Sequence, residues 1–218
     1  MSSPPRLHLV GHPTDEQIEA ATAVCVRAFQ DETAVRAMSG GDAALAHLLF
    51  ASMLRTAREG GTLHLVTRDG EVLAVGLWFG PGRKMFATEE QRRLGFDVFM
   101  ARLSPAMQGW WKNEYGKDVA LMKSDILGTD GDLNSWYAQV IATDPIHQGK
   151  GYGGMLIQEA RRLAREDSSS LALATTNRDS ASWYEHQGFT TLGVRRIQGS
   201  PVDPQLHFDC IFMRFDDP

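Results

Sequence analysis

The sequence predicts an α/β protein with a mixed β-sheet, folded as a single domain over residues 1–218. An Asp-Gly pair between two apolar runs, at Asp69-Gly70, is a strong hairpin signal. The apolar run 136–143 is typical of a central strand buried on both faces. A glycine cluster then opens a helix whose apolar residues recur at helical spacing, and further strands follow it.

The first half predicts a strand, two helices and a hairpin. Thr14 with Gln17 three residues later has the pattern of a capping box, and Asp42 can cap the next helix. Gly60-Gly61 ends that second helix. The elements expected here are a strand at 4–11, helices at 15–30 and 42–59, and strands at 62–67 and 72–79.

Residues 83–133 are expected to form a helical insertion before the central strand. Helical spacing from Phe96 to Leu103 predicts one helix that ends at Ser104-Pro105, and a weaker helical stretch runs to about residue 124. The tryptophans of this region and of the central strand point to an enclosed apolar pocket for a small ligand. They are Trp110, Trp111 and Trp136.

The last third is expected to complete the sheet. Gly188 is a suitable C-terminal glycine for a short helix before it. The expected elements are a helix at 151–165, a buried strand at 171–175, a helix at 180–186, and an antiparallel pair at 189–197 and 207–215.

Composition limits the partners and the compartment. A net charge of -5 without a Lys/Arg stripe argues against a nucleic-acid partner. No apolar run approaches the roughly 18–20 residues that span a bilayer, and the first ten residues do not resemble a secretory signal. Cys25 and Cys210 are too few and too distant for a disulfide framework or a zinc site, so no metal is expected. We therefore expect a cytoplasmic protein, a monomer or a homodimer, without membrane contact.

The stretch 144–154 carries the chemistry, because four glycines allow backbone N–H groups to converge on an anion at a helix start. It is not a P-loop, since Lys150 is followed by Gly151 instead of Ser or Thr. Gly149, Gly151 and Gly154 formally match a dinucleotide fingerprint. However, five residues separate them from the strand, and the next strand ends without the carboxylate that would bind ribose.

Two motifs resemble those of the GNAT superfamily of N-acetyltransferases. Residues 148–153, Gln-Gly-Lys-Gly-Tyr-Gly, resemble its Q/R-x-x-G-x-G/A motif. Residues 177–189 resemble its N-x-x-A-x-x-x-Y-E-x-x-G-F segment, with Ser180 in place of Ala. The resemblance covers residues 134–215 and is closest to small-molecule acetyltransferases of the puromycin-resistance type.

This resemblance implies a GNAT-like fold with splayed central strands, acetyl-CoA as co-substrate, and direct acetyl transfer to the amine of a small molecule. The loop amides would hold the pyrophosphate, the amide of Ile141 would donate to the thioester carbonyl, and Asn177 would bind the pantetheine or phosphate arm. Tyr184 would be the catalytic general acid that protonates the leaving thiolate. The implied cofactor-binding residues are Ile141, Ala142, Thr143, Gln148, Gly149, Lys150, Gly151, Tyr152, Gly153, Gly154, Asn177 and Tyr184.

The general base stays open at this point. Related enzymes carry a Glu where this chain has Tyr137 or Ala174. The alternatives are a water relay or one of four side chains, Asp31, Glu32, His207 and Asp209. Two other functions also stay open: an acyl-CoA-binding protein with little turnover, and a peptide or protein N-acetyltransferase.

Overall fold

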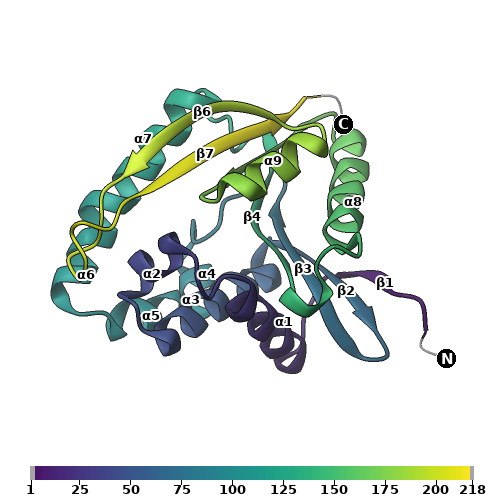
Figure 1. Cartoon of the computed structure of the whole chain (residues 1–218), viewed down its shortest axis with the longest axis horizontal. Coiled ribbons are helices and arrows are strands. Elements are labelled where there is room, and N and C mark those ends of the chain that lie inside the picture. Colours follow the sequence, from purple (N-terminus) through teal and green to yellow (C-terminus); the bar gives the residue numbers. More distant parts are fainter. Residues whose placement is uncertain (1–2, 217–218) are drawn as a thin grey trace.

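A single seven-stranded mixed sheet organises the computed structural model, which describes residues 3–216 (Figure 1). The strand order is β1-β2-β3-β4-β5-β7-β6, and only the central pair β4–β5 is parallel. The strands are β1 (Arg6–Val10), β2 (Thr62–Arg68), β3 (Glu71–Phe79), β4 (Ser135–Thr143), β5 (Ser170–Thr175), β6 (Thr190–Ile197) and β7 (Phe208–Phe215). The predicted fold class is confirmed.

Helices cover both faces of the sheet. The N-terminal group comprises α1 (Asp15–Ala28), α2 (Thr33–Ser39), α3 (Ala43–Arg55) and the 3₁₀ turn η1 (Thr56–Glu59). The insertion holds α4 (Glu89–Arg93), α5 (Phe96–Arg102), α6 (Pro105–Trp110), the π-helix η2 (Trp111–Tyr115) and α7 (Gly116–Leu127). The 3₁₀ turn η3 (Pro145–His147), α8 (Tyr152–Glu166) and α9 (Arg178–His186) complete the set.

The local signals read from the sequence act as predicted at the element ends. Thr14 and Gln17 form both bonds of the capping box on α1. Asp69 and Gly70 have φ angles of 51° and 86°, the left-handed pair that a tight hairpin turn requires. Most predicted boundaries therefore lie within a few residues of the observed ones.

Two segments differ from the prediction. Helix α2 was not expected, because seven residues are too few for a clear periodic pattern. In the insertion, Ser104 does end α5, but it also caps α6, since its side chain accepts a hydrogen bond from the amide of Met107. A single signal thus closes one helix and opens the next.

Strand β4 contains a one-residue bulge, which determines the face of the sheet to which the following side chains point. Leu77 pairs with Val140 and Trp78 pairs with Ala138, so Gln139 is the extra residue. Tyr137 and Val140 therefore both point to the face covered by the N-terminal helices and the insertion. Ala138 points to the opposite face, which α8 and α9 cover.

Strands β4 and β5 separate partway along their length. They pair from Ser135 to Ala138 only, whereas β4 continues along β3 to Thr143 and β5 continues along β7. In Figure 1 the two halves of the sheet spread apart on either side of β4. The predicted splay of the central strands is confirmed.

Within residues 3–216, none of the helices taken singly has the length and apolarity to cross a bilayer. Only α2 and α3 with η1 meet that test when joined, across a bend of 97°.

Candidate active site

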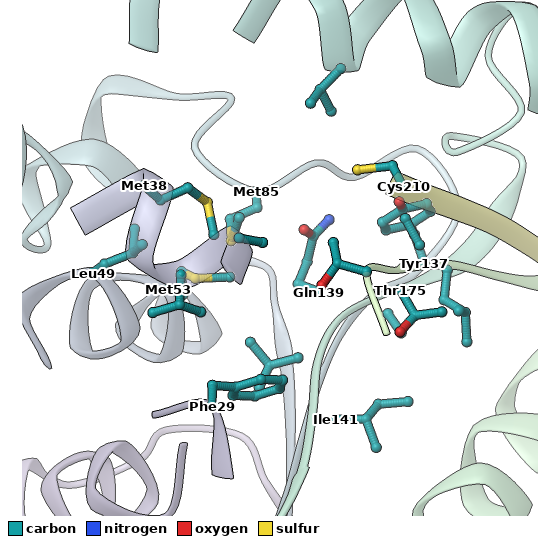
Figure 2. Close-up of a pocket in the computed structure, with 18 of the residues that line it drawn as sticks. Phe29, Met38, Leu49, Met53, Met85, Tyr137, Gln139, Ile141, Thr175 and Cys210 are labelled. Carbon is teal, nitrogen blue, oxygen red and sulfur yellow. The ribbon is translucent and has the colours of Figure 1, made fainter. Parts of the chain in front are cut away.

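A cavity of about 540 Å³ lies where β4 and β5 part. Side chains from both faces of the sheet line it, including Tyr137 and Val140 from one face and Tyr184 from the other. The cavity therefore passes through the sheet at the splay. Figure 2 shows Phe29, Leu49 and three methionines on one side, Tyr137 and Thr175 on the other, and Gln139 between them; the methionines are Met38, Met53 and Met85.

The glycine loop follows the end of the same β4 strand. Gly149 and Gly151 have φ angles of 73° and 86°, and a Cβ at either position would meet nothing within 4 Å. Helix α8 starts without a side-chain cap, and the backbone amides of residues 149–154 have no acceptor among the described residues. This is the geometry of an anion site at a helix N-terminus.

The loop is anchored by a buried carboxylate. Asp144 is 2% exposed, and one of its oxygens accepts from Arg27 Nε of α1 at 2.9 Å. The other oxygen accepts from the amide of Ile146 at 3.3 Å. Gln148 Nε2 donates to the carbonyl of Thr143 at 3.3 Å, and Lys150 Nζ donates to the carbonyl of Ile146 at 3.0 Å. These bonds fix the loop and leave the backbone amides of residues 149–154 free.

Tyr184 lies on α9 and lines the cavity. It is 8% exposed, and its hydroxyl makes no hydrogen bond in the part of the chain that the structure describes. Burial raises the pKa of Tyr184, so the phenol keeps its proton at neutral pH. A buried phenol that faces a cavity with a free O–H is able to donate a proton or a hydrogen bond to a ligand there.

Glu32, one of the four predicted candidates for the base, also lines the cavity. Its Oε1 accepts from Asn177 Nδ2 at 2.9 Å, and its Oε2 accepts from Thr176 Oγ1 at 3.3 Å. Asn177 in turn caps α9 through bonds to the amides of Asp179 and Ser180. The carboxylate is thereby fixed at the end of β5, beside the splay.

The structure does not bring the other three candidates to this cavity. Asp209 is paired with Arg196 and Arg178, and its bond to Arg196 is the main reason that its pKa is lowered. Neither His207 nor Asp31 is among the lining residues. Glu32 is therefore the predicted base that the fold supports.

The tryptophan prediction is only partly right. Trp111 lines the cavity, but Trp110 is buried in the core at 2% exposure. Trp136 packs on Gly80 and donates from its indole nitrogen to Asp167 at 2.8 Å, so it is not a wall of the cavity. Trp136 points, like Ala138, to the face of the sheet opposite the insertion.

The far end of the cavity holds polar groups that the sequence did not predict. Asp132 lies between Lys84 and Lys123, at 3.3 and 3.6 Å. Lys123 also lies over the ring of Tyr137, 3.9 Å from its centroid. The signal was present in the spacing of Trp111, Tyr115, Val119 and Lys123, which recur every four residues and all line the cavity. No group of His, Cys, Asp and Glu within residues 3–216 could hold a metal ion.

Comparisons with known proteins agree with this geometry. Residues 110–191 match the model of the acetyltransferase (GNAT) domain. This part of the chain is therefore similar to the GNAT acetyltransferases. This family consists of acyltransferases that use acetyl-CoA. Over 125 residues the chain is 27% identical to an uncharacterized N-acetyltransferase of Schizosaccharomyces pombe, a match that covers 57% of this chain. The chain spans half the length of that relative.

Solved structures share the GNAT fold over nearly the whole chain. A polyamine N-acetyltransferase of Drosophila melanogaster, which forms N-acetylagmatine, aligns with a TM-score of 0.62 at 11% identity and covers 97% of this chain and 99% of its own. An acetyltransferase related to histone acetyltransferases, from Corynebacterium glutamicum, gives 0.56 at 18% identity over 98% and 96%. A putative acetyltransferase of Salmonella typhimurium, solved with acetyl-CoA, gives 0.55 at 13% identity over 98% and 94%.

Proposed function

We propose that this GNAT-fold protein transfers the acetyl group of acetyl-CoA directly to the amine of a small molecule in the cytosol. The observation that carries the proposal is the continuity of the site along one strand. The cavity opens where β4 leaves β5, and the loop with free amides follows the end of that same β4. A thioester carrier with its diphosphate on the loop would direct its acyl end along β4 into the cavity.

The acceptor amine must lose a proton before it attacks, because a primary amine resembles lysine in its pKa and is mostly protonated at neutral pH. We propose Glu32 as the group that receives this proton, directly or through a water. It is the carboxylate at the splay, held by Asn177 and Thr176.

The remaining steps need a donor to the oxyanion and a donor to the thiolate. Beyond Ala138, β4 no longer pairs with β5, so the backbone amides of β4 that face this side are free to donate. We assign the hydrogen bond to the oxyanion to the amide of Ile141. We assign the proton for the leaving thiolate to the hydroxyl of Tyr184. Asn177 positions Glu32 and the start of α9, and its contact with the coenzyme arm stays a proposal.

A small acceptor fits better than a protein substrate. The cavity is lined by apolar and aromatic side chains of the insertion and of α2 and α3, and its volume is that of a small-ligand pocket. A peptide would need an open groove on this surface. A mass-spectrometric assay with basic peptides decides this point, because acetylation of peptides at rates above those of small amines would favour the alternative function.

The direct test of the base is Glu32→Gln with Asp31→Asn as control. A glutamine preserves both hydrogen bonds, because its oxygen accepts from Asn177 and its amide donates to the Thr176 hydroxyl. We expect kcat, measured by thiol release from acetyl-CoA, to fall about 100-fold or more in Glu32→Gln while acetyl-CoA affinity is unchanged. Asp31→Asn should retain full turnover. Equal activity of both variants would remove Glu32 from the mechanism, and no thiol release with any amine would favour an acyl-CoA-binding role.

A further inference from the structure

We propose that the acceptor is an amino carboxylate: a small molecule whose amine faces Glu32 and whose carboxylate binds Lys123 at the other end of the cavity. This inference rests on the proposed acetyltransferase function and names its substrate class. Three independent features support it: the charges that line the cavity, the unpartnered donors in the same cavity, and the helix that presents some of them.

The cavity lining has more cations than carboxylates. Its cationic residues are Arg83, Lys84, Arg92 and Lys123, and its carboxylates are Glu32 and Asp132. Asp132 is taken by two lysines, and Arg83 and Arg92 donate to backbone carbonyls, with no carboxylate partner within residues 3–216. The far end of the cavity thus has an excess of positive charge that a bound anion would compensate.

Lys123 is the cation best placed for that anion. Its side chain is 20% exposed, compared with 46% for Lys84, and it lies between Asp132 and the ring of Tyr137. Burial lowers the pKa of Lys123, and Asp132 opposes this effect only in part. A second negative group beside it would therefore stabilise the charged lysine.

Neutral donors line the same cavity as this lysine and have no hydrogen-bond partner among the described residues. Tyr137 is 4% exposed and lines the cavity, and no hydrogen-bond partner for its hydroxyl is found among the described residues. The same holds for the hydroxyl of Tyr115 and the amide of Gln139. Figure 2 shows Gln139 with its amide directed away from the strand and toward the space between Met85 and Tyr137. Tyr137 is buried and Tyr115 and Gln139 are half-buried, and a polar ligand in the cavity would supply the hydrogen-bond partner that these side chains lack among the described residues.

The π-helix affects which side chains of the insertion face the cavity. Residues spaced by four drift around an α-helix by about 40° at each step, since the period is 3.6 residues. The turn from Trp111 to Tyr115 is wider, with the amide of Gly116 donating to the carbonyl of Trp111. This wider turn offsets the drift between Trp111 and Tyr115, so that both face the cavity. Such π segments are frequent at functional sites.

The position of the charges selects an amino carboxylate over a polyamine. A diamine would place its second cation against Lys123, Lys84 and the two arginines, where like charges repel. A carboxylate at that end meets a cation and two phenols, while the methionines and aromatic rings between the ends suit an apolar body. The expected acceptors are therefore ω-amino carboxylates, in which an apolar chain separates the amine from the carboxylate.

The test compares acceptors that differ only at the second group. Thiol release from acetyl-CoA is measured with an ω-amino carboxylate, its carboxamide, and an alkylamine and a diamine of equal length. We expect kcat/KM for the carboxylate to exceed that of its carboxamide about 30-fold, the effect of a hydrogen bond to a charged group. Equal or better turnover of the diamine or the carboxamide would overturn the inference but leave the acetyltransferase function intact.

The variant Lys123→Met tests whether the preference for carboxylates depends on Lys123. Lys117→Met, on the same helix, is the control. Lys84 still pairs with Asp132 in Lys123→Met, and Lys117 is exposed and does not line the cavity. We expect Lys123→Met to abolish the preference for carboxylates and Lys117→Met to retain it. Calorimetric binding of the same carboxylates and carboxamides, in the presence of coenzyme A, decides the inference even if no acceptor is acetylated. A preference that survives in Lys123→Met, or is absent from the wild type, would contradict it.

Discussion

Asn177 Nδ2 donates to Glu32 Oε1 at 2.9 Å, joining two residues that are 145 positions apart in the sequence. Glu32 precedes α2, and Asn177 caps α9 on the other side of the sheet opening. One side chain thus fixes the start of a helix with its oxygen and a cavity carboxylate with its nitrogen. The position of the proposed base and the stability of α9 therefore both depend on the side-chain amide of Asn177.

Replacing Asn177 by Ser separates these two tasks. Serine is nearly as good a cap as asparagine, so we expect α9 to keep its stability, whereas the bond to Glu32 is lost. Turnover should fall about 10-fold, with a melting temperature close to that of the wild type. Asn177→Ala should lose turnover and, in addition, about 1 kcal/mol of unfolding free energy. If Ser retained full turnover, the bond to Glu32 would have no catalytic role.

Tyr184→Phe tests the proposed acid. The hydroxyl faces the cavity and makes no hydrogen bond within the described chain, so we expect its removal to leave the packing of α9 unchanged. We expect kcat to decrease about 100-fold while the dissociation constant of acetyl-CoA, measured by calorimetry, stays the same. A parallel loss of affinity and kcat, or no change in either, would exclude the assignment.

The glycine loop can be tested with a pair of variants at Gly151. A Cβ there meets no atom within 4 Å, but the φ angle of 86° strains any side chain, so Gly151→Ala measures the strain alone. Gly151→Asp adds a carboxylate where the diphosphate is proposed to bind. We expect acetyl-CoA affinity to fall at least about 10-fold further in Asp than in Ala. Equal affinities would place the diphosphate elsewhere.

Most of the fold could be predicted because its signals are local. The capping box at Thr14, the Asp69-Gly70 turn and the apolar run of β4 each specify an element without reference to distant residues. Helix α2 and the division of the insertion into several helices could not be predicted, because short helices owe their stability to tertiary packing. The bulge at Gln139 also could not be predicted, because it is defined by the pairing of β4 with β3 and has no local sequence signal.

The sequence allowed the part of the candidate site with the glycine loop and Tyr184 to be predicted. It did not allow prediction of the part that is proposed to bind the acceptor. Tyr184 and the loop residues belong to segments with recognisable patterns, and the fold places Tyr184 at the cavity. Glu32 could only be one candidate among four, because its proximity to Asn177 is a property of the folded chain. Lys123 appeared as an ordinary helical lysine, and its meaning depends on Asp132 and Tyr137 beside it.

Because His64 is buried, we predict that the unfolding free energy of the protein decreases in mild acid. Its ring is fully buried, and neither nitrogen has a hydrogen-bond partner within residues 3–216. Burial lowers its pKa to about 4 from an ordinary value of 6.5. Between these values the unfolded chain binds a proton that the folded chain does not, so stability is complete above pH 6.5 and decreases toward pH 4, by up to about 3 kcal/mol. Urea unfolding across this range should show that slope in the wild type and in His207→Leu, and His64→Leu should lack it.

Gly116 and Gly109 make a matched test of the π-helix. A Cβ on Gly116 would lie 2.8 Å from the carbonyl oxygen of Trp111, whereas a Cβ on Gly109 in α6 meets nothing within 4 Å. Gly116→Ala should therefore lower the unfolding free energy by about 1–3 kcal/mol, since the backbone must shift to admit the methyl group. Gly109→Ala should be neutral or stabilising by up to about 1 kcal/mol, because alanine is the better helix former.

The same pair reports on the acceptor end of the cavity. A shifted π turn would rotate Tyr115 and Lys123 relative to the cavity, so KM for the acceptor should rise in Gly116→Ala while acetyl-CoA affinity, which depends on the loop after β4, stays constant. Gly109→Ala should leave both quantities unchanged. If Gly116→Ala altered stability without altering the acceptor KM, the π-helix would be a packing feature only, since the groups that it presents would not contact the acceptor.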